Sequence, residues 1–271
     1  MLVDTHCHLN LLVEYSFDVP LSQNELERAQ LFLEEAFQQD VTKILNVGTS
    51  LIESKNSIAL AKMYPSIYAS VGIHPNDLTD SWRSDLKELE TLLENKTESK
   101  IVAIGECGLD THYPDYDLPR QKEAFFRQIE MALEHDLALV IHTRDAAEET
   151  LRCLEPYKNK GMRGTVHCFS EDLSFAQEAI SYGFVVGIGG TLTYPKNNVL
   201  RQVAQAVGLE HIILETDAPF LPPQEQRGKK NHPKNIQLIA QYLAELLGVT
   251  YQEVAQKTTA NANRIFFKDY L

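Results

Sequence analysis

Short apolar runs alternate with longer amphipathic segments along almost the whole chain. The short runs are rich in Val, Ile and Leu and are bounded by turn residues, which is typical of buried strands. They predict strands at 2–8, 41–48, 67–73, 100–106, 137–142, 163–168, 184–189 and 210–216. The longer segments repeat apolar residues at the helical period. They predict helices near 23–39, 51–63, 82–95, 120–135, 145–157, 172–182, 197–207 and 234–247, then one or two short helices from about 251 to 266.

Eight strand–helix units in series predict an α/β fold in which a parallel sheet closes on itself, the (β/α)8 TIM barrel, here with a short C-terminal helical extension. Breaker residues such as Gly48, Pro65 and Gly183 lie in the expected connections. No Ser/Gly-rich linker, low-complexity tract or block of charge divides the chain. We therefore expect residues 1–271 to form a single domain.

Composition narrows the class of protein. The 271 residues are 44% hydrophobic and 23% charged, which is enough apolar material for a large core. The N-terminal region resembles neither a signal peptide nor a membrane anchor, and no apolar stretch of about 18 residues follows. We expect a cytoplasmic protein with no membrane contact, and nothing implies an obligate protein partner. A net charge of −13 argues against a surface that coats nucleic acid. It leaves room for a nuclease that holds phosphates through metal ions and one basic loop.

Three of the four cysteines, Cys7, Cys107 and Cys168, stand next to a candidate metal ligand in the sequence. Because side chains alternate along a strand, these thiols should face the opposite way, toward the packed helices. We interpret them as small buried hydrophobic residues, neither ligands nor disulfide partners.

Imidazole and carboxylate side chains stand where most of the predicted strands end. His6 and His8 are two residues apart, so a strand places both on one face. The other residues of this kind at strand ends are His74, Glu106, His142, His167 and Asp217. The carboxyl ends of parallel barrel strands meet at one mouth, where barrel enzymes place their active sites. We therefore expect these side chains to converge.

Apart from His74, which is considered below, these residues are four histidines and two carboxylates. They exceed what one tetrahedral ion needs, so the pattern predicts a pair of divalent ions. We expect this division: His6, His8 and Asp217 at one ion, His142 and His167 at the other, and Glu106 as the bridge. A water bridged between the two ions would then attack an ester or phosphodiester centre. Glu106 and Asp217 are the expected catalytic residues, with Asp217 holding or accepting the proton of that water.

Several other residues have two interpretations each. His74 is expected to contact substrate or phosphate and not to be a seventh ligand. Glu215 either orients a ligand histidine or is a buried charge paired with a basic residue. His112 either lines the mouth or lies in a solvated loop, whereas His135 and His211 are expected to have structural roles.

The cationic candidates are also open to two interpretations. Arg144 and Arg120 either reach a substrate phosphate or pair with a carboxylate. The one dense basic stretch, residues 227–234, follows the last predicted strand, and its place above the expected mouth favours phosphate binding over a solvated loop. Arg227 and Lys229 are its expected substrate-binding residues.

The ordered set of motifs resembles the TatD family of metal-dependent nucleases, within the amidohydrolase-like barrels. The resemblance covers the chain nearly end to end, through Asp4-Thr5-His6-Cys7-His8, Gly72-Ile73-His74-Pro75, Gly105-Glu106-Cys107-Gly108-Leu109-Asp110, His142-Thr143-Arg144, His167-Cys168-Phe169-Ser170, Glu215-Thr216-Asp217-Ala218-Pro219, Arg227-Gly228-Lys229 and Asn261-Ala262-Asn263-Arg264-Ile265-Phe266. It implies DNase activity, often exonucleolytic, with Mg²⁺ commonly supporting turnover and Zn²⁺ or other divalent ions in the site.

Two positions depart from the family pattern: Asn76 stands where many relatives carry a second histidine, and Thr111 where many carry an aromatic residue.

Together, the ligand pattern and the resemblance predict a metal-dependent hydrolase with two divalent ions (Mg²⁺, Mn²⁺ or Zn²⁺) acting on a single-stranded DNA end. A D-aminoacyl-tRNA deacylase that uses the same ions on charged tRNA is the alternative that the resemblance also implies. A metal-stabilised binding protein is a third possibility, and it would hold saturated ions, whereas a hydrolase leaves one position for water or substrate.

Overall fold

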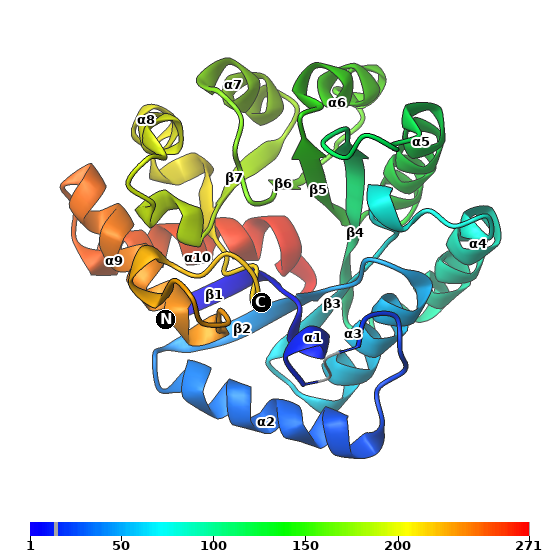
Figure 1. Ribbon diagram of the computed structural model, residues 1–271, viewed down its shortest axis with the longest axis horizontal. Coiled ribbons are helices and arrows are strands. Elements are labelled where there is room, and N and C mark those ends of the chain that lie inside the picture. Colours follow the sequence, from blue (N-terminus) through cyan, green and yellow to red (C-terminus); the bar gives the residue numbers. More distant parts are fainter. Residues whose placement is uncertain (14–15, 271) are drawn as a thin grey trace.

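The computed structural model describes residues 1–13 and 16–270 as a barrel of eight parallel strands surrounded by helices (Figure 1). The strands pair in the order of the sequence, each with the next. They are β1 (Leu2–Cys7), β2 (Val41–Val47), β3 (Ile67–Val71), β4 (Ile101–Asp110), β5 (Ala138–Arg144), β6 (Gly164–Val166), β7 (Phe184–Ile188) and β8 (Ile212–Leu214).

Helices follow every strand, as the sequence predicts. They are α1 (Leu9–Val13), α2 (Gln23–Phe37), α3 (Leu51–Met63), α4 (Trp82–Leu92), α5 (Leu118–Glu134), α6 (Ala147–Leu154), α7 (Leu173–Ser181), α8 (Asn198–Val207), α9 (Ile236–Leu247) and α10 (Tyr251–Phe266). Their ends follow local chemistry. The Ser22 side chain and Glu25 form a reciprocal capping box at the start of α2, and Gly248 in the left-handed region ends α9.

The first strand and the segment after the last strand close the barrel. Cys7 pairs in parallel with Ala218, and the backbone N–H of Asp217 donates to the carbonyl of His6 at 2.8 Å. The Thr5 hydroxyl also donates to the Leu214 carbonyl at 2.9 Å. The prediction of a TIM barrel is confirmed.

Apolar side chains fill the barrel at its amino end. Val3, Leu45, Val140, Val185 and Ile213 belong to one buried cluster, together with Ile265, Phe266 and Phe267 at the end of the chain. Helix α10 crosses behind the strands in Figure 1 and supplies part of this cluster. The predicted C-terminal extension therefore closes one end of the barrel, and the opposite end is left for polar chemistry.

Strand β4 continues to Asp110, beyond its predicted end at Glu106. The register to β5 shifts between Ile104 and Cys107, and a Cβ on Gly108 would lie 1.9 Å from the carbonyl oxygen of His142. The glycine lets the two strands approach closely. The longer strand carries a second carboxylate to the mouth. Strands β6 and β8 are shorter than predicted, and α1 was not predicted.

No helix in the described part of the chain is long and apolar enough to cross a membrane.

A buried hydrogen bond ties the seam of the barrel together. The carboxyl group of Asp4 is fully buried and accepts from the Thr216 hydroxyl at 2.6 Å and from the Thr216 N–H at 2.9 Å. Burial raises the pKa of Asp4 to about 7, although the hydrogen bonds from Thr216 lower it. The seam therefore depends on a polar group that water does not reach.

Replacing Thr216 by valine keeps the shape of the side chain but removes its hydroxyl donor. We expect Thr216→Val to lower the free energy of unfolding by about 1–3 kcal/mol, because a buried carboxyl group loses a partner. Urea unfolding of the metal-free protein measures this loss. Thr165→Val is the control, since that buried hydroxyl donates only to a backbone carbonyl, of Val185, at 3.3 Å. Equal losses in the two variants would contradict the special role of the Asp4 contact.

Candidate metal centre

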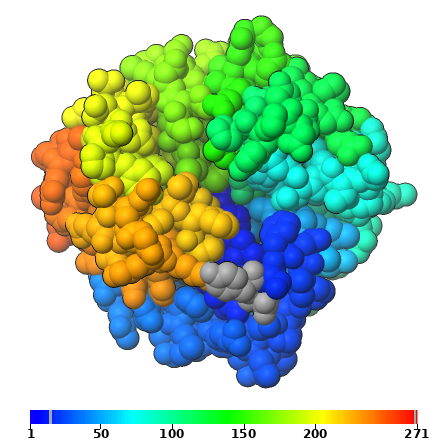
Figure 2. Space-filling model, viewed as in Figure 1, coloured from blue at the N-terminus to red at the C-terminus, as the bar shows by residue number. Residues whose placement is uncertain are grey.

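The six predicted metal ligands all lie in one cluster at the carboxyl end of the barrel. Three come from strands β1, β4 and β5, and three follow the ends of β1, β6 and β8; they are His6, His8, Glu106, His142, His167 and Asp217. A cavity of 740 Å³ opens above them. Figure 2 shows the hollow at the centre of this face, ringed by blue, green and orange segments. The predicted convergence is therefore observed.

The Glu106 carboxylate is the centre of the cluster, and its two oxygens face different histidines. Oε2 lies 3.4 Å from Nε2 of His6 and 3.8 Å from Nε2 of His8. Oε1 lies 2.9 Å from Nδ1 of His142 and 2.8 Å from Nε2 of His167. One carboxylate thus separates two sets of nitrogen ligands.

The first set has the dimensions of a coordination polyhedron. Nε2 of His6 and Nε2 of His8 are 3.1 Å apart, and Oδ1 of Asp217 lies 3.6 Å from the former and 3.3 Å from the latter. A tetrahedron with metal–ligand distances of about 2.1 Å has edges of about 3.4 Å. Together with Oε2 of Glu106, these atoms fit one divalent ion.

The second set has a supporting carboxylate that the sequence analysis missed. Nδ1 of His142 and Nε2 of His167 are 3.4 Å apart, and Nε2 of His142 lies 3.0 Å from Oδ2 of Asp110. A carboxylate on the far nitrogen fixes the imidazole tautomer, so that Nδ1 keeps its lone pair for a metal. The signal was the small and apolar stretch from Cys107 to Leu109, which continues β4 past Glu106.

His74 points a hydrogen-bond donor at the same carboxylate. Its Nδ1 accepts from the backbone N–H of Asn76 at 3.1 Å, and its Nε2 lies 3.4 Å from Oε1 of Glu106. Burial lowers the pKa of His74 to about 3, so the ring is neutral and its hydrogen is on Nε2. His74, Asp110 and His142 also form a group with metal-ligand spacing. The N–H on Nε2 nevertheless makes His74 better suited to donate to a substrate oxygen than to bind an ion, and its substrate contact stays a prediction.

The histidines around Glu106 stabilise its buried negative charge when no cation is bound, and the pKa values of the cluster reflect this. Burial raises the pKa of Glu106, but His167, His74 and His142 outweigh it and hold that pKa well below its ordinary value. Burial lowers the pKa of His142, yet the hydrogen bonds to Asp110 and Glu106 raise it to about 9. The pKa of His6 shifts in the opposite direction to that of His142, because burial lowers it to about 4.

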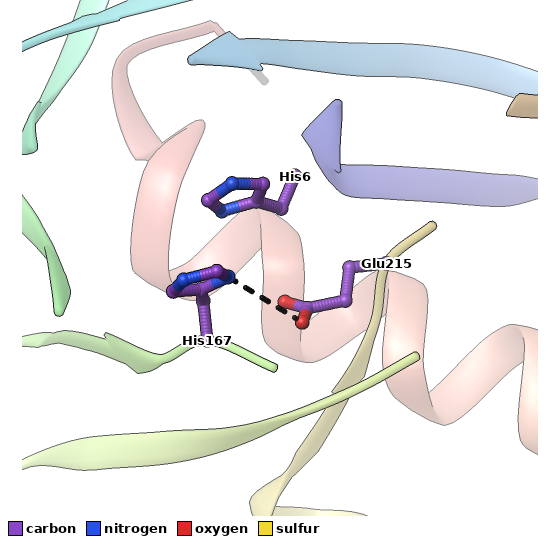
Figure 3. Close-up of side chains that lie close together, drawn as sticks. All are labelled: His6, His167 and Glu215. Atoms are coloured by element: carbon purple, nitrogen blue, oxygen red, sulfur yellow. Dashed lines mark ion pairs between the residues drawn. The ribbon is translucent and has the colours of Figure 1, made fainter. Parts of the chain in front are cut away.

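Glu215 lies close to two of the candidate ligand rings, those of His6 and His167 (Figure 3). It is fully buried, its Oε1 accepts from the N–H of Cys168, and the same oxygen is 3.9 Å from Nδ1 of His167. The rings of His6 and His167 are stacked at 3.9 Å. Burial raises the pKa of Glu215 to about 8. These contacts favour the interpretation that Glu215 orients a ligand histidine over that of a charge paired with a basic residue.

The expectation for Cys168 was wrong. Cys7 and Cys107 are buried as predicted, but Cys168 is partly exposed and lines the cavity. The reason is local: β6 ends at Val166, and Cys168 has a φ of 45°. The alternation of a strand therefore does not extend to this thiol.

Two of the other candidates pair with acidic groups, and one lines the cavity. Arg144 lines it, with its guanidinium 5.6 Å from the ring centre of Tyr113. Arg120 pairs with Asp80 at 3.1 Å. His112 pairs with Asp145 at 2.7 Å, and it is not among the residues that line the cavity; the same holds for His135 and His211.

The basic loop lies away from the cavity wall. Arg227 packs over the ring of Tyr194 at 4.6 Å, and the Lys229 ammonium donates to Gln226 at 3.3 Å. Neither is among the described residues that line the cavity. Their role in substrate binding stays a prediction.

Comparisons with known proteins show the family of this chain. The sequence profile described as TatD related DNase matches residues 3–267. This chain belongs to that family. The uncharacterized metal-dependent hydrolase YabD of Bacillus subtilis is 34% identical over 266 residues, which cover 98% of this chain and 99% of that protein. The crystal structure of the TatD homologue YjjV from Escherichia coli superposes with a TM-score of 0.86 at 31% identity, and the match covers 98% of each chain.

One relative has a named activity. The 3'-5' ssDNA/RNA exonuclease TatD of Citrobacter rodentium is 33% identical over 237 residues, which cover 85% of this chain and 89% of that protein. Family membership and the ligand cluster together identify this TatD-family chain as a metal-dependent hydrolase.

Metal loading of this TatD-family site should release protons. His142 is protonated near neutral pH in the metal-free protein because its pKa is about 9, and a cation at its Nδ1 must displace that proton. Asp110→Asn removes a carboxylate that raises this pKa, so we expect fewer protons to be released per ion at about pH 8. Titration calorimetry with Zn²⁺ in buffers of different ionisation enthalpy measures the release. Asp80→Asn, at an exposed position, is the control. Unchanged release in Asp110→Asn would contradict this assignment.

Proposed function

We propose that residues 1–271 form one hydrolase domain that removes nucleotides from single-stranded nucleic-acid ends with the help of two divalent cations. The observation that carries the proposal is the division of the ligand nitrogens between the two oxygens of Glu106. The name of the Citrobacter rodentium relative supports the substrate class. Mg²⁺, Mn²⁺ and Zn²⁺ are the candidate ions, and a cytoplasmic location belongs to the same proposal.

In this proposal the ligands are divided between two ions. Glu106 would be the ligand that both ions share. The ligands are otherwise assigned as the geometry groups them: His6, His8 and Asp217 on one side, and His142 and His167 on the other. Asp110 and Glu215 hold the imidazoles in place.

When bound, a pair of divalent ions polarises the phosphodiester and lowers the pKa of a water. The protein then provides direction and proton transfer. Asp217 is the carboxylate that holds or accepts the proton of the attacking water. The N–H on Nε2 of His74 donates to a phosphate oxygen, and Arg144 adds positive charge at the wall of the cavity.

The size and charge of the protein favour a single-stranded end as substrate. The cavity of 740 Å³ is in the range of pockets that hold one small ligand. A chain with a net charge of −13 repels a long polyanion. A terminal nucleotide can enter the barrel mouth, whereas a duplex would need a broad basic track.

The bridging role predicts a large loss of turnover rate when the carboxylate of Glu106 is replaced by a neutral amide. Glu106→Gln should keep the fold but lower turnover of labelled single-stranded DNA by at least about a hundredfold, because a ligand of both ions is lost. Glu123→Gln, which alters an exposed ion pair with Arg83, should turn over like the parent. Rates with Mg²⁺, Mn²⁺ and Zn²⁺ and circular dichroism spectra are the measurements. Near-normal turnover in Glu106→Gln would rule out the bridge.

The substrate needs its own test, since the same ligands can serve ester hydrolysis. We expect the parent protein to shorten single-stranded DNA from an end and to leave D-aminoacyl-tRNA charged, in parallel assays with each ion. Deacylation of the tRNA without cleavage of DNA would replace the proposed nuclease by the deacylase. Binding of the ions without either reaction would point to a metal-stabilised binding protein.

A further inference from the structure

Exposed aromatic side chains gather around the mouth of the barrel. Among the described residues, five aromatic side chains of Phe, Tyr or Trp are exposed: Phe17, Phe37, Tyr113, Tyr116 and Phe220. Phe17, Tyr113 and Phe220 line the metal cavity. Aromatic surface is costly to expose to water, so its concentration at one site points to a ligand with apolar faces.

A second cavity extends the first. It has a volume of 410 Å³ and shares Asn76 and Tyr113 with the metal cavity. Tyr116 and Arg120 lie on its wall. Tyr113 thus stands where the two cavities meet, and Phe37, at the end of α2, lines neither. The two cavities together lead from the candidate metal centre across Tyr113 to Tyr116.

The backbone holds Phe220 close to the first set of ligands. Its ring centre is 5.8 Å from that of His8, and its N–H donates to the Asp217 carbonyl at 2.7 Å. On the other wall, the Arg144 guanidinium lies over the ring of Tyr113. Because 49% of Phe220 and 50% of Tyr113 are exposed, both have surface left for a ligand.

The charges on the cavity walls argue against a strand that is held by its phosphates through a row of Lys and Arg. The described lining of the metal cavity has four carboxylates, from Asp77, Glu106, Asp110 and Asp217, and one Lys or Arg side chain, Arg144. In the second cavity, Arg120 is paired with Asp80 and Asp117, and Asp115 also lines the wall. A strand held by its phosphates needs a row of Lys and Arg, whereas a strand held by its bases needs aromatic faces. The walls of both cavities have the composition that suits a strand held by its bases.

We propose that Phe220 and Tyr113 are stacking platforms for the unpaired bases next to the phosphodiester at the metal centre, and that Tyr116 receives a further base. The proposal rests on the proposed nuclease function and names its ligand: the bases of a single strand, recognised by their flat faces. Every base has such a face, so binding is tolerant of sequence. Bases in a duplex are paired and stacked on one another, so a duplex cannot use these platforms.

The test compares base-containing and abasic ends. The substrates are a single-stranded DNA oligonucleotide and the same oligonucleotide with abasic residues at its terminal positions. The paired variant Tyr113→Ala/Phe220→Ala should raise KM for the normal strand by about tenfold or more and leave kcat near the parent value. It should leave KM for the abasic strand unchanged. Tyr113→Phe/Phe220→Tyr should restore the parent KM, and Phe37→Ala is the matched control for loss of an exposed aromatic ring.

Three outcomes separate the possibilities. A rise in KM on both strands would overturn the proposal, because the rings would then serve only as cavity walls. A rise caused instead by Arg227→Ala/Lys229→Ala, with a flatter salt dependence and no effect of the aromatic variants, would also overturn it in favour of capture by charge. Fluorescence anisotropy gives the Kd of the same strands without turnover. Base-dependent binding that is lost in Tyr113→Ala/Phe220→Ala, in a protein that cuts no strand, would support the platforms and reject the nuclease.

Discussion

The carboxylate of Glu106 lies 2.8–3.8 Å from nitrogen atoms of five imidazoles, and the rest of the site is arranged around it. An anion buried to this degree costs several kcal/mol unless positive charge accompanies it. Without a cation, burial raises the pKa of Glu106, but His167, His74 and His142 hold it low. Burial lowers the pKa of His142, but its hydrogen bonds to Asp110 and Glu106 raise it to about 9. Divalent cations are the natural source of positive charge, because the nitrogens on either side of Glu106 already lie at distances typical of ligands that share an ion. The barrel makes this possible by filling its amino end with apolar side chains and bringing the ends of its strands together at the other.

The barrel and the convergence of six candidate ligands could be predicted from the sequence because each signal is local. An apolar run that ends in His, Glu or Asp specifies both a strand and the position of its ligand, and parallel closure then brings the strand ends together. Asp110 was missed because β4 bends at Gly105 and Gly108 and continues beyond its first ligand. Cys168 was assigned the wrong direction because its backbone leaves the strand conformation. The basic loop was placed above the mouth by its position in the sequence, but packing of Arg227 on Tyr194 and pairing of Lys234 with Glu35 are tertiary contacts that no local pattern contains.

Because the net charge is −13, the proposed nuclease would need a means of attracting a polyanion other than a basic surface. The described walls of the cavity above the candidate ligands combine four carboxylates with exposed aromatic rings, and Arg144 is the one Lys or Arg side chain among them. In the proposed function, bound cations would give the phosphate one strong local contact, and the aromatic rings would supply contact area for the bases. The two proposals also separate roles among residues that line the cavity: His74 and Arg144 would contact the reacting phosphate, and Phe220 and Tyr113 would contact the bases beside it.

Anomalous X-ray diffraction from crystals loaded with Mn²⁺ tests the role of Glu106 most directly. The account predicts two peaks about 3.5–4 Å apart. One should lie among His6, His8 and Asp217, the other beside His142 and His167, with one oxygen of Glu106 on each. A single peak would contradict the bridging arrangement. So would a second peak among His74, Asp110 and His142 that Glu106 does not contact.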